Sequence, residues 1–130
     1  MSRILMLNYE FPPLGGGGGV AAKTMAKEFV EKGYNVDYVT SRYPGQPKCE
    51  RVSGIDVHRV RVGRRKKSAA SMHSMLAYPP AGFPRCVRLC TKYDYELLNS
   101  HFAVPSGPLG VIISTLFDLK HVLSIHGGDI

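Results

Sequence analysis

The sequence predicts an α/β protein with a doubly wound parallel sheet of about five strands, on the basis of three observations. Short apolar runs of strand length recur along the 130 residues. Between them lie segments whose apolar residues repeat every three or four positions, as on helices that pack against a sheet. Polar or glycine-rich segments follow several strand-like runs. The resulting order of strand, helix, strand, strand, helices, strand, helix and strand is typical of this class.

The strands are predicted from apolar or β-branched runs. The first, Ile4 to Leu7, is continuously apolar, which is typical of a strand buried on both faces of a parallel sheet. The run from Ile55 to Val62 is rich in β-branched residues but broken by charges, so we expect it to form an edge strand. The expected strands cover residues 4–7, 36–40, 55–62, 95–99 and 122–125.

The helices are predicted from apolar spacing and from the residues that end them. Between Val20 and Lys32 the apolar residues form one stripe with charged residues opposite, and Gly33 follows where a helix stop is expected. Pro79 and Pro80 are expected to separate two helices, because proline lacks the amide donor that a helix interior needs. The expected helices cover residues 20–32, 71–78, 83–93 and 109–117.

Composition indicates a soluble globular domain. Apolar content is 44% and charged content 21%, and no apolar stretch has the length of a membrane span. The residues after Met1 lack the apolar region of a signal peptide, so we expect a cytoplasmic protein with reduced thiols. Cys86 and Cys90 are expected to be buried thiols, since they lack the spacing and the nearby histidine of a metal site. No metal or other cofactor is expected.

Three segments are expected to meet at the carboxyl ends of the strands, where such sheets bind ligands. They are residues 10–19, which end in five consecutive glycines, the turn at Ser100 and His101, and residues 126–129. Backbone without side chains lets an anionic or sugar-like ligand come close, and the free amides of a helix's first turn then face it. The remaining histidines are assigned to the surface or to packing: His58, His73 and His121.

Two common glycine motifs fit this run poorly. Residues 16–21 have the form of a dinucleotide fingerprint, but a proline-containing segment separates them from the strand, and no acidic residue ends the second strand. Residues 17–24 differ from a phosphate loop by Ala22, and Lys23 belongs to the helical stripe. A non-catalytic flavodoxin-like or nucleotide- or phosphate-binding module remains an alternative function.

Three motifs in order resemble the first domain of family 4 glycosyltransferases. They are residues 8–22 with the glycine run, residues 94–103 with a strand ending at His101, and residues 122–129, an apolar run followed by His-Gly-Gly-Asp. The resemblance covers nearly the whole chain. It implies a Rossmann-like, three-layer α/β/α domain on the acceptor side of a retaining, nucleotide-sugar-dependent enzyme of the GT-B fold.

The resemblance also implies roles for individual residues. His126 would line the reaction centre and Asp129 would fix that turn, while Glu10 and His101 would face the acceptor. The donor phosphate and the transferred sugar would lie against Gly16, Gly17, Gly18 and Gly19. The family's carboxyl-terminal, donor-binding domain is not contained in residues 1–130, so we expect these residues alone to transfer no sugar.

The net charge of +7 is unevenly distributed. A basic patch suits nucleic acid, an anionic membrane surface or a phosphorylated substrate, and no nucleic-acid-binding motif accompanies this one. By the resemblance, it would be the cationic face with which a peripheral enzyme approaches the inner membrane surface and a lipid or glycan acceptor. The residues expected in this face are Arg64, Arg65, Lys66, Lys67, Arg85 and Arg88.

Overall fold

The computed structural model describes residues 2–12, 17–62, 72–101 and 106–124. Within them, six strands form one sheet in the order β3-β4-β2-β1-β5-β6. Five strands run parallel, and β3 alone is antiparallel to its neighbour β4. The strands are β1 (Arg3–Leu7), β2 (Asn35–Arg42), β3 (Cys49–Val52), β4 (Ile55–Arg61), β5 (Tyr95–His101) and β6 (His121–Ser124). The predicted Rossmann-like α/β class is confirmed.

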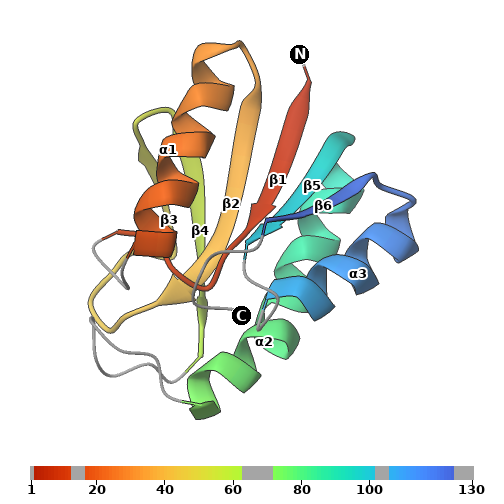
Figure 1. The fold of residues 1–130 in the computed structure, drawn as a ribbon. Helices are drawn as coiled ribbons and strands as arrows, with labels where there is room; N and C mark the ends of the chain where they lie inside the picture. The colour runs from red at the N-terminus through yellow and green to blue at the C-terminus, as the bar shows by residue number, and fades with distance from the viewer. Residues whose placement is uncertain (1, 13–16, 63–71, 102–105, 125–130) are drawn as a thin grey trace.

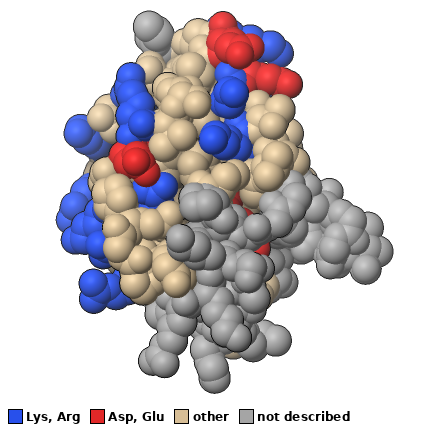
Figure 2. All heavy atoms as spheres, turned by 90° about the vertical axis from the view of Figure 1, so that its left-hand side faces the viewer, with Lys and Arg blue, Asp and Glu red and all other residues tan. Residues whose placement is uncertain are grey.

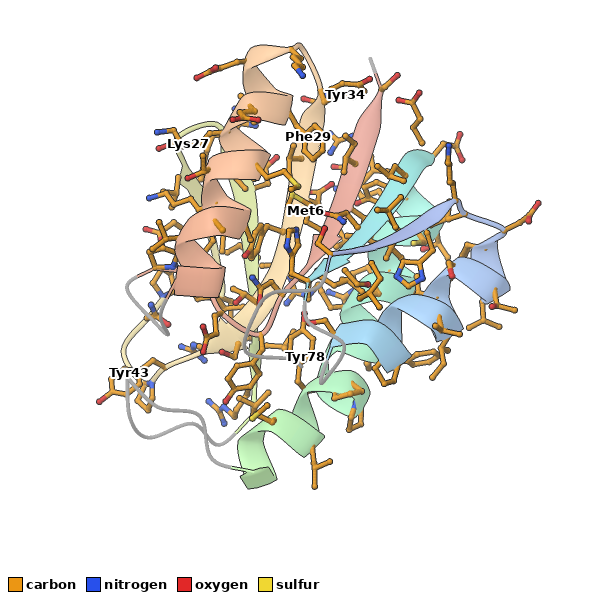
Figure 3. The ribbon with its side chains drawn as sticks, in the orientation of Figure 1. Met6, Lys27, Phe29, Tyr34, Tyr43 and Tyr78 are labelled. Carbon is orange, nitrogen blue, oxygen red and sulfur yellow. The ribbon has the colours of Figure 1, made fainter. Side chains whose placement is uncertain are left out.

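Helices cover both faces of the sheet and make three layers (Figure 1). The helix α1 (Gly17–Glu31) packs on one face, and α2 (Met72–Lys92) and α3 (Ser106–Phe117) pack on the other. The alternation of β1 divides its side chains between two cores. Ile4 and Met6 join the core under α1, near Phe29 in Figure 3, whereas Leu5 and Leu7 join the core under α2 and α3.

The strand β4 is not the edge strand that the sequence predicts. It pairs with β2 on one side and with β3 on the other, so β3 forms that edge of the sheet. Ser53 and Gly54 join β3 to β4 and have φ angles of 52° and 83°. Positive φ at both central residues is typical of a type I′ hairpin turn. The Ser53-Gly54 pair indicates this hairpin in the sequence. The charged residues within Cys49–Val52 make that segment look unlike a strand, so the hairpin was not predicted.

The expected break at Pro79 and Pro80 is also wrong. The helix α2 continues through both and through Pro84. An interior proline costs about 3 kcal/mol because it removes a donor and clashes with the preceding turn. Large side chains on either side of the prolines are buried in the same core, including Tyr78 and Leu89. Each such burial stabilises by roughly 1.5–3 kcal/mol, which explains why tertiary packing outweighs the local preference.

Candidate active site

The centre of the sheet contains a change in winding direction at β1 and β5. The chain passes from β1 to α1 on one face and from β5 to α3 on the other, although the two strands are neighbours (Figure 1). In open α/β sheets, ligands bind beside the carboxyl ends of the strands at such a point. This edge is therefore the candidate active site.

The segment that follows β1 is held rigidly at this edge. The Asn8 Oδ1 atom accepts a hydrogen bond from the Glu10 amide at 3.0 Å. The carbonyl of Tyr9 accepts hydrogen bonds from Thr40 Oγ1 at 3.0 Å and from Ser41 Oγ at 2.6 Å. The Ser41 amide also donates to the Tyr9 carbonyl at 3.2 Å, so the hydroxyls at the end of β2 add to backbone hydrogen bonds that continue beyond β1.

Two tyrosines support the same segment from opposite faces of the sheet. Tyr38 donates to the Glu10 carbonyl at 2.8 Å, and its ring packs edge-on against Phe11 with centroids 4.8 Å apart. Burial raises the pKa of the Tyr38 hydroxyl, which therefore remains a donor. Tyr78 reaches from α2 to the Val39 carbonyl at 2.6 Å (Figure 3). The backbone around Glu10 is consequently fixed, and the Glu10 side chain is half-buried there.

The helix α1 begins earlier than predicted. Gly17, Gly18 and Gly19 form its first turn instead of a loop before Val20. Glycine is unfavourable in a helix interior, but the first-turn amides have no partner within the helix in any case. This turn contains no acidic side chain. Its amides and the positive end of the helix dipole suit an anionic ligand.

The end of β5 contributes a buried polar group. His101 is fully buried, as is Asn99 apart from 2% of its surface. The Asn99 amide nitrogen donates to the Val122 carbonyl at 3.0 Å and to Ser124 Oγ at 3.1 Å. Within the described residues, the buried Asn99 Oδ1 atom has no hydrogen-bond partner. The sequence analysis did not identify Asn8 and Asn99 as site residues. Their positions at or just after the end of an apolar strand could have indicated them.

Several predicted site residues lie outside the described residues. The strand β6 ends at Ser124, and the register places Ser124 beside His101 at the same edge. Glu10, the start of α1 and His101 therefore all lie at the carboxyl-end edge of the sheet. Outside the described residues lie Gly16, Arg64, Arg65, Lys66, Lys67, His126 and Asp129.

The two described members of the predicted basic face differ. Arg88 is exposed, whereas Arg85 is half-buried and donates from Nη1 to Cys49 Sγ at 3.2 Å. Figure 2 shows further Lys and Arg side chains on the side that carries α1 and β3, with a few acidic side chains among them.

None of the helices described is both long enough and apolar enough to cross a membrane. Across the described ranges, no three His, Cys, Asp or Glu side chains are grouped so that they could hold a metal ion.

Residues 15–130 match Glycosyltransferase Family 4, and the chain belongs to this family. It is 25% identical over 124 residues to N-acetyl-alpha-D-glucosaminyl L-malate synthase of Bacillus anthracis, a match that covers 91% of this chain and 30% of that protein. It is 37% identical over 60 residues to an uncharacterized glycosyltransferase of Methanocaldococcus jannaschii, covering 45% of this chain and 15% of that protein. The chain thus spans less than a third of the length of these curated relatives.

Solved structures share the fold. Sucrose-phosphate synthase from Thermosynechococcus elongatus has a TM-score of 0.80 at 18% identity, covering 98% of this chain and 33% of that one. The C-terminal domain of a hydrogenase from Pyrococcus furiosus has a TM-score of 0.64 at 13% identity, covering 95% of this chain and 90% of that one. Because unrelated functions share this fold, it is the family match that favours a glycosyltransferase over the non-catalytic alternative.

Proposed function

We propose that the chain is the acceptor-side domain of a retaining glycosyltransferase, which uses a nucleotide-sugar donor together with a separate donor-binding domain. Family membership carries this proposal, and it is supported by the position of Glu10, the start of α1 and His101 at the carboxyl-end edge of the sheet. The short span relative to the relatives supports a two-domain enzyme.

The start of α1 is the proposed contact for the donor. Sugar transfer leaves negative charge on the departing nucleoside diphosphate. Amides of Gly17, Gly18 and Gly19 would stabilise this charge, because they are fixed in a helical turn before the reaction begins. Gly16 would extend the same surface. Any larger residue in place of these glycines would keep the diphosphate and the transferred sugar away from the backbone.

Glu10 and His101 are the proposed acceptor contacts. Glu10 follows β1 and His101 is the last residue of β5, and the hydrogen bonds around Tyr9 fix the backbone beside Glu10. His126, two residues beyond the end of β6, is proposed to line the reaction centre, with Asp129 holding its turn. We expect no metal ion in this arrangement, because the backbone amides would stabilise part of the charge on the leaving group.

Exposed apolar side chains support packing against a second domain. Val111 and Leu116 on α3 are 56% and 60% exposed, and Val122 on the edge strand β6 is 42% exposed. Exposed apolar surface of this kind is typical of an interaction surface.

We also propose a peripheral, cytoplasmic enzyme that approaches an anionic membrane and takes a lipid or glycan acceptor. Each Lys or Arg near an anionic leaflet contributes on the order of 1 kcal/mol. Arg88 is available for such contact, and Arg64, Arg65, Lys66 and Lys67 are proposed to act with it. Arg85 is held by Cys49, so its share is expected to be smaller.

Sugar transfer is tested with a panel of nucleotide sugars and detection of the released nucleoside diphosphate. The chain alone is compared with a chimera that carries the remaining part of the Bacillus anthracis relative. We expect turnover only in the chimera. We expect Gly18→Val to reduce it about 100- to 1,000-fold, the loss typical of removing one donor to a developing charge, because the added side chain would hold the diphosphate away from the amides. Val20→Ala, on the exposed side of the same turn, is the control. Turnover by the chain alone, or a fully active Gly18→Val chimera, would contradict the proposal.

Membrane binding is tested by sedimentation with vesicles of phosphatidylcholine alone or mixed with phosphatidylglycerol. We expect binding to the anionic vesicles only, weakened by Arg88→Glu and by added salt. Equal binding to both vesicles, or to neither, would remove the membrane from the proposal and leave sugar transfer untouched.

A further inference from the structure

A second polar cluster lies on the opposite sheet face from α1, where α2 crosses β2, β3 and β4. At its centre the Asp37 carboxylate, 2% exposed, accepts three hydrogen bonds. They come from Arg3 Nη1 at 2.9 Å, Tyr95 Oη at 2.7 Å and His58 Nε2 at 3.0 Å. Burial by itself would raise the pKa of Asp37, but the hydrogen bonds from His58 and Tyr95 and the charges of His58 and Arg3 lower it overall. Asp37 is therefore a buried carboxylate ion.

This carboxylate fixes the proton of His58. A carboxylate only accepts hydrogen bonds, so the ring nitrogen that faces it, Nε2, must carry the hydrogen. In the neutral ring the other nitrogen, Nδ1, then offers a lone pair on the outer side. That atom lies 3.8 Å from Cys49 Sγ, within hydrogen-bond distance for sulfur. Cys49 and His58 are direct partners in the β3–β4 register, which holds them face to face.

A guanidinium group completes the surroundings of the thiol. Arg85 Nη1 lies 3.2 Å from Cys49 Sγ and 3.4 Å from His58 Nδ1. Its positive charge lies where it can stabilise the negative charge that develops on the sulfur during nucleophilic attack. The cysteine is exposed. It lines a cavity of about 360 Å³ together with His58, Leu89, Lys92 and Tyr93, so a small molecule can reach the sulfur.

The other two cysteines have contrasting surroundings. Cys86 is fully buried, and burial raises its pKa. Cys90 is half-buried, and burial raises its pKa to about 11. Both therefore keep their protons near neutral pH and serve as internal references for Cys49.

We propose that Cys49 is a nucleophilic thiol, assisted by His58 and Arg85, that forms mixed disulfides with small disulfide molecules entering this cavity. The side chains involved lie on β3, β4 and α2, away from the carboxyl-end edge that carries the candidate active site. The proposal concerns a modification site and does not depend on the proposed sugar transfer.

The exchange balances without another reactant. His58 Nδ1 takes the proton from the Cys49 thiol, and the sulfur attacks one sulfur of the incoming disulfide. A new bond forms between Cys49 Sγ and that sulfur, and the original sulfur–sulfur bond breaks. The departing thiolate receives the proton from His58. Cys49 is oxidised, and half of the small disulfide is reduced to a thiol.

The test uses the whole chain with glutathione disulfide as the probe and mass spectrometry of the peptides as the readout. We expect the added glutathionyl group on Cys49 and not on Cys86 or Cys90. Initial rates with iodoacetamide measure the thiol's reactivity independently of the disulfide. Arg85→Met and His58→Gln should each slow both reactions about tenfold, because each removes a charged or basic group at hydrogen-bond distance from the sulfur.

Arg61→Met is the matched control, since it removes an exposed arginine from β4, the strand that carries His58, and it should leave both rates unchanged. Thermal unfolding of each variant shows whether it is folded at the assay temperature. If one of the two variants, Arg85→Met or His58→Gln, is unfolded at the assay temperature, the reaction rates of the other variant test the proposal. The proposal is overturned if Cys49 reacts no faster than Cys90, or if folded Arg85→Met or His58→Gln protein reacts at the unaltered rate.

Discussion

The two polar regions of this molecule are built in opposite ways. At the carboxyl ends of the strands, neutral hydroxyls and amides fix the backbone of a short segment around Tyr9. Under α2, a buried carboxylate collects two basic side chains and a phenol. The first region depends on several hydrogen bonds of moderate strength, so the loss of one leaves the others in place. The second depends on one charge, whose removal would leave its partly buried partners Arg3 and His58 without their counter-ion.

This difference corresponds to what each region can do. An edge whose backbone is fixed by neutral groups, beside the first-turn amides of α1, suits the binding of an anionic ligand. A fixed ionic cluster instead sets the proton position of one imidazole. Substitutions in the two regions should therefore differ in the size of their effects.

The largest effect is expected for Asp37→Ala. The change leaves His58 and Arg3 beside a cavity without their anion, and breaking a buried ion pair from one side costs about 3–5 kcal/mol. Urea unfolding measures the change in the free energy of unfolding. Asp56→Ala is the control, because its pair with Arg51 is exposed and should contribute no more than about 1 kcal/mol. Equal effects of the two substitutions would show that the buried Asp37 carboxylate contributes no more to stability than an exposed ion pair.

A smaller loss is expected for Asn8→Ala at the carboxyl-end edge. It removes the acceptor of the Glu10 amide in a buried position, which costs about 1–3 kcal/mol. Asn8→Asp keeps an acceptor oxygen at the same place and should lose less. Both are measured by urea unfolding. An Asn8→Ala loss as large as that of Asp37→Ala would show that this edge also depends on a single group.

A still smaller loss is expected for Thr40→Val. The Tyr9 carbonyl loses one donor but keeps Ser41 Oγ and the Ser41 amide. We expect about 0.5–1.5 kcal/mol, the net contribution of one hydrogen bond. The double variant with Ser41→Ala should lose more than the sum of the single variants, since each hydroxyl compensates for the other. Simple additivity in urea unfolding would contradict this shared support.

The pH dependence distinguishes the Asp37 cluster from His121, which lies at the start of β6 outside both regions. His121 lies 2.8 Å from Ser100 Oγ, and burial lowers its pKa below 6.5. The unfolded chain then binds this proton more readily than the folded protein, so stability from His121 is complete above pH 6.5 and declines as the pH falls below it. The Asp37 contribution is complete above pH 3.8 and declines as the pH falls below that value.

The measurement is the free energy of unfolding as a function of pH for the unaltered protein and for His121→Gln. The difference between the two should change below pH 6.5 and stay constant above it. A constant difference across the acid range would show that His121 has the same proton affinity in the folded and unfolded chains.

Much of the fold could be predicted because its determinants are local. The apolar run in β1 and the apolar stripe of α1 are readable from spacing, as is the order of elements that places strand ends together. The hairpin at Ser53 and Gly54 was also present in the sequence and was missed. The proline-containing α2 could not be predicted locally, because burial against the sheet and not propensity maintains it.

The sequence by itself determined the family, the class of sheet and the edge at which glycines and His101 would meet, because short motifs and strand order carry that information. Only the tertiary structure decided that Asp37, His58, Cys49 and Arg85 form one cluster. These residues come from four separate elements, and no spacing along the chain indicates their contact. Their proximity results from strand pairing and from the packing of α2 on the sheet, and both of these form only when the whole core is assembled.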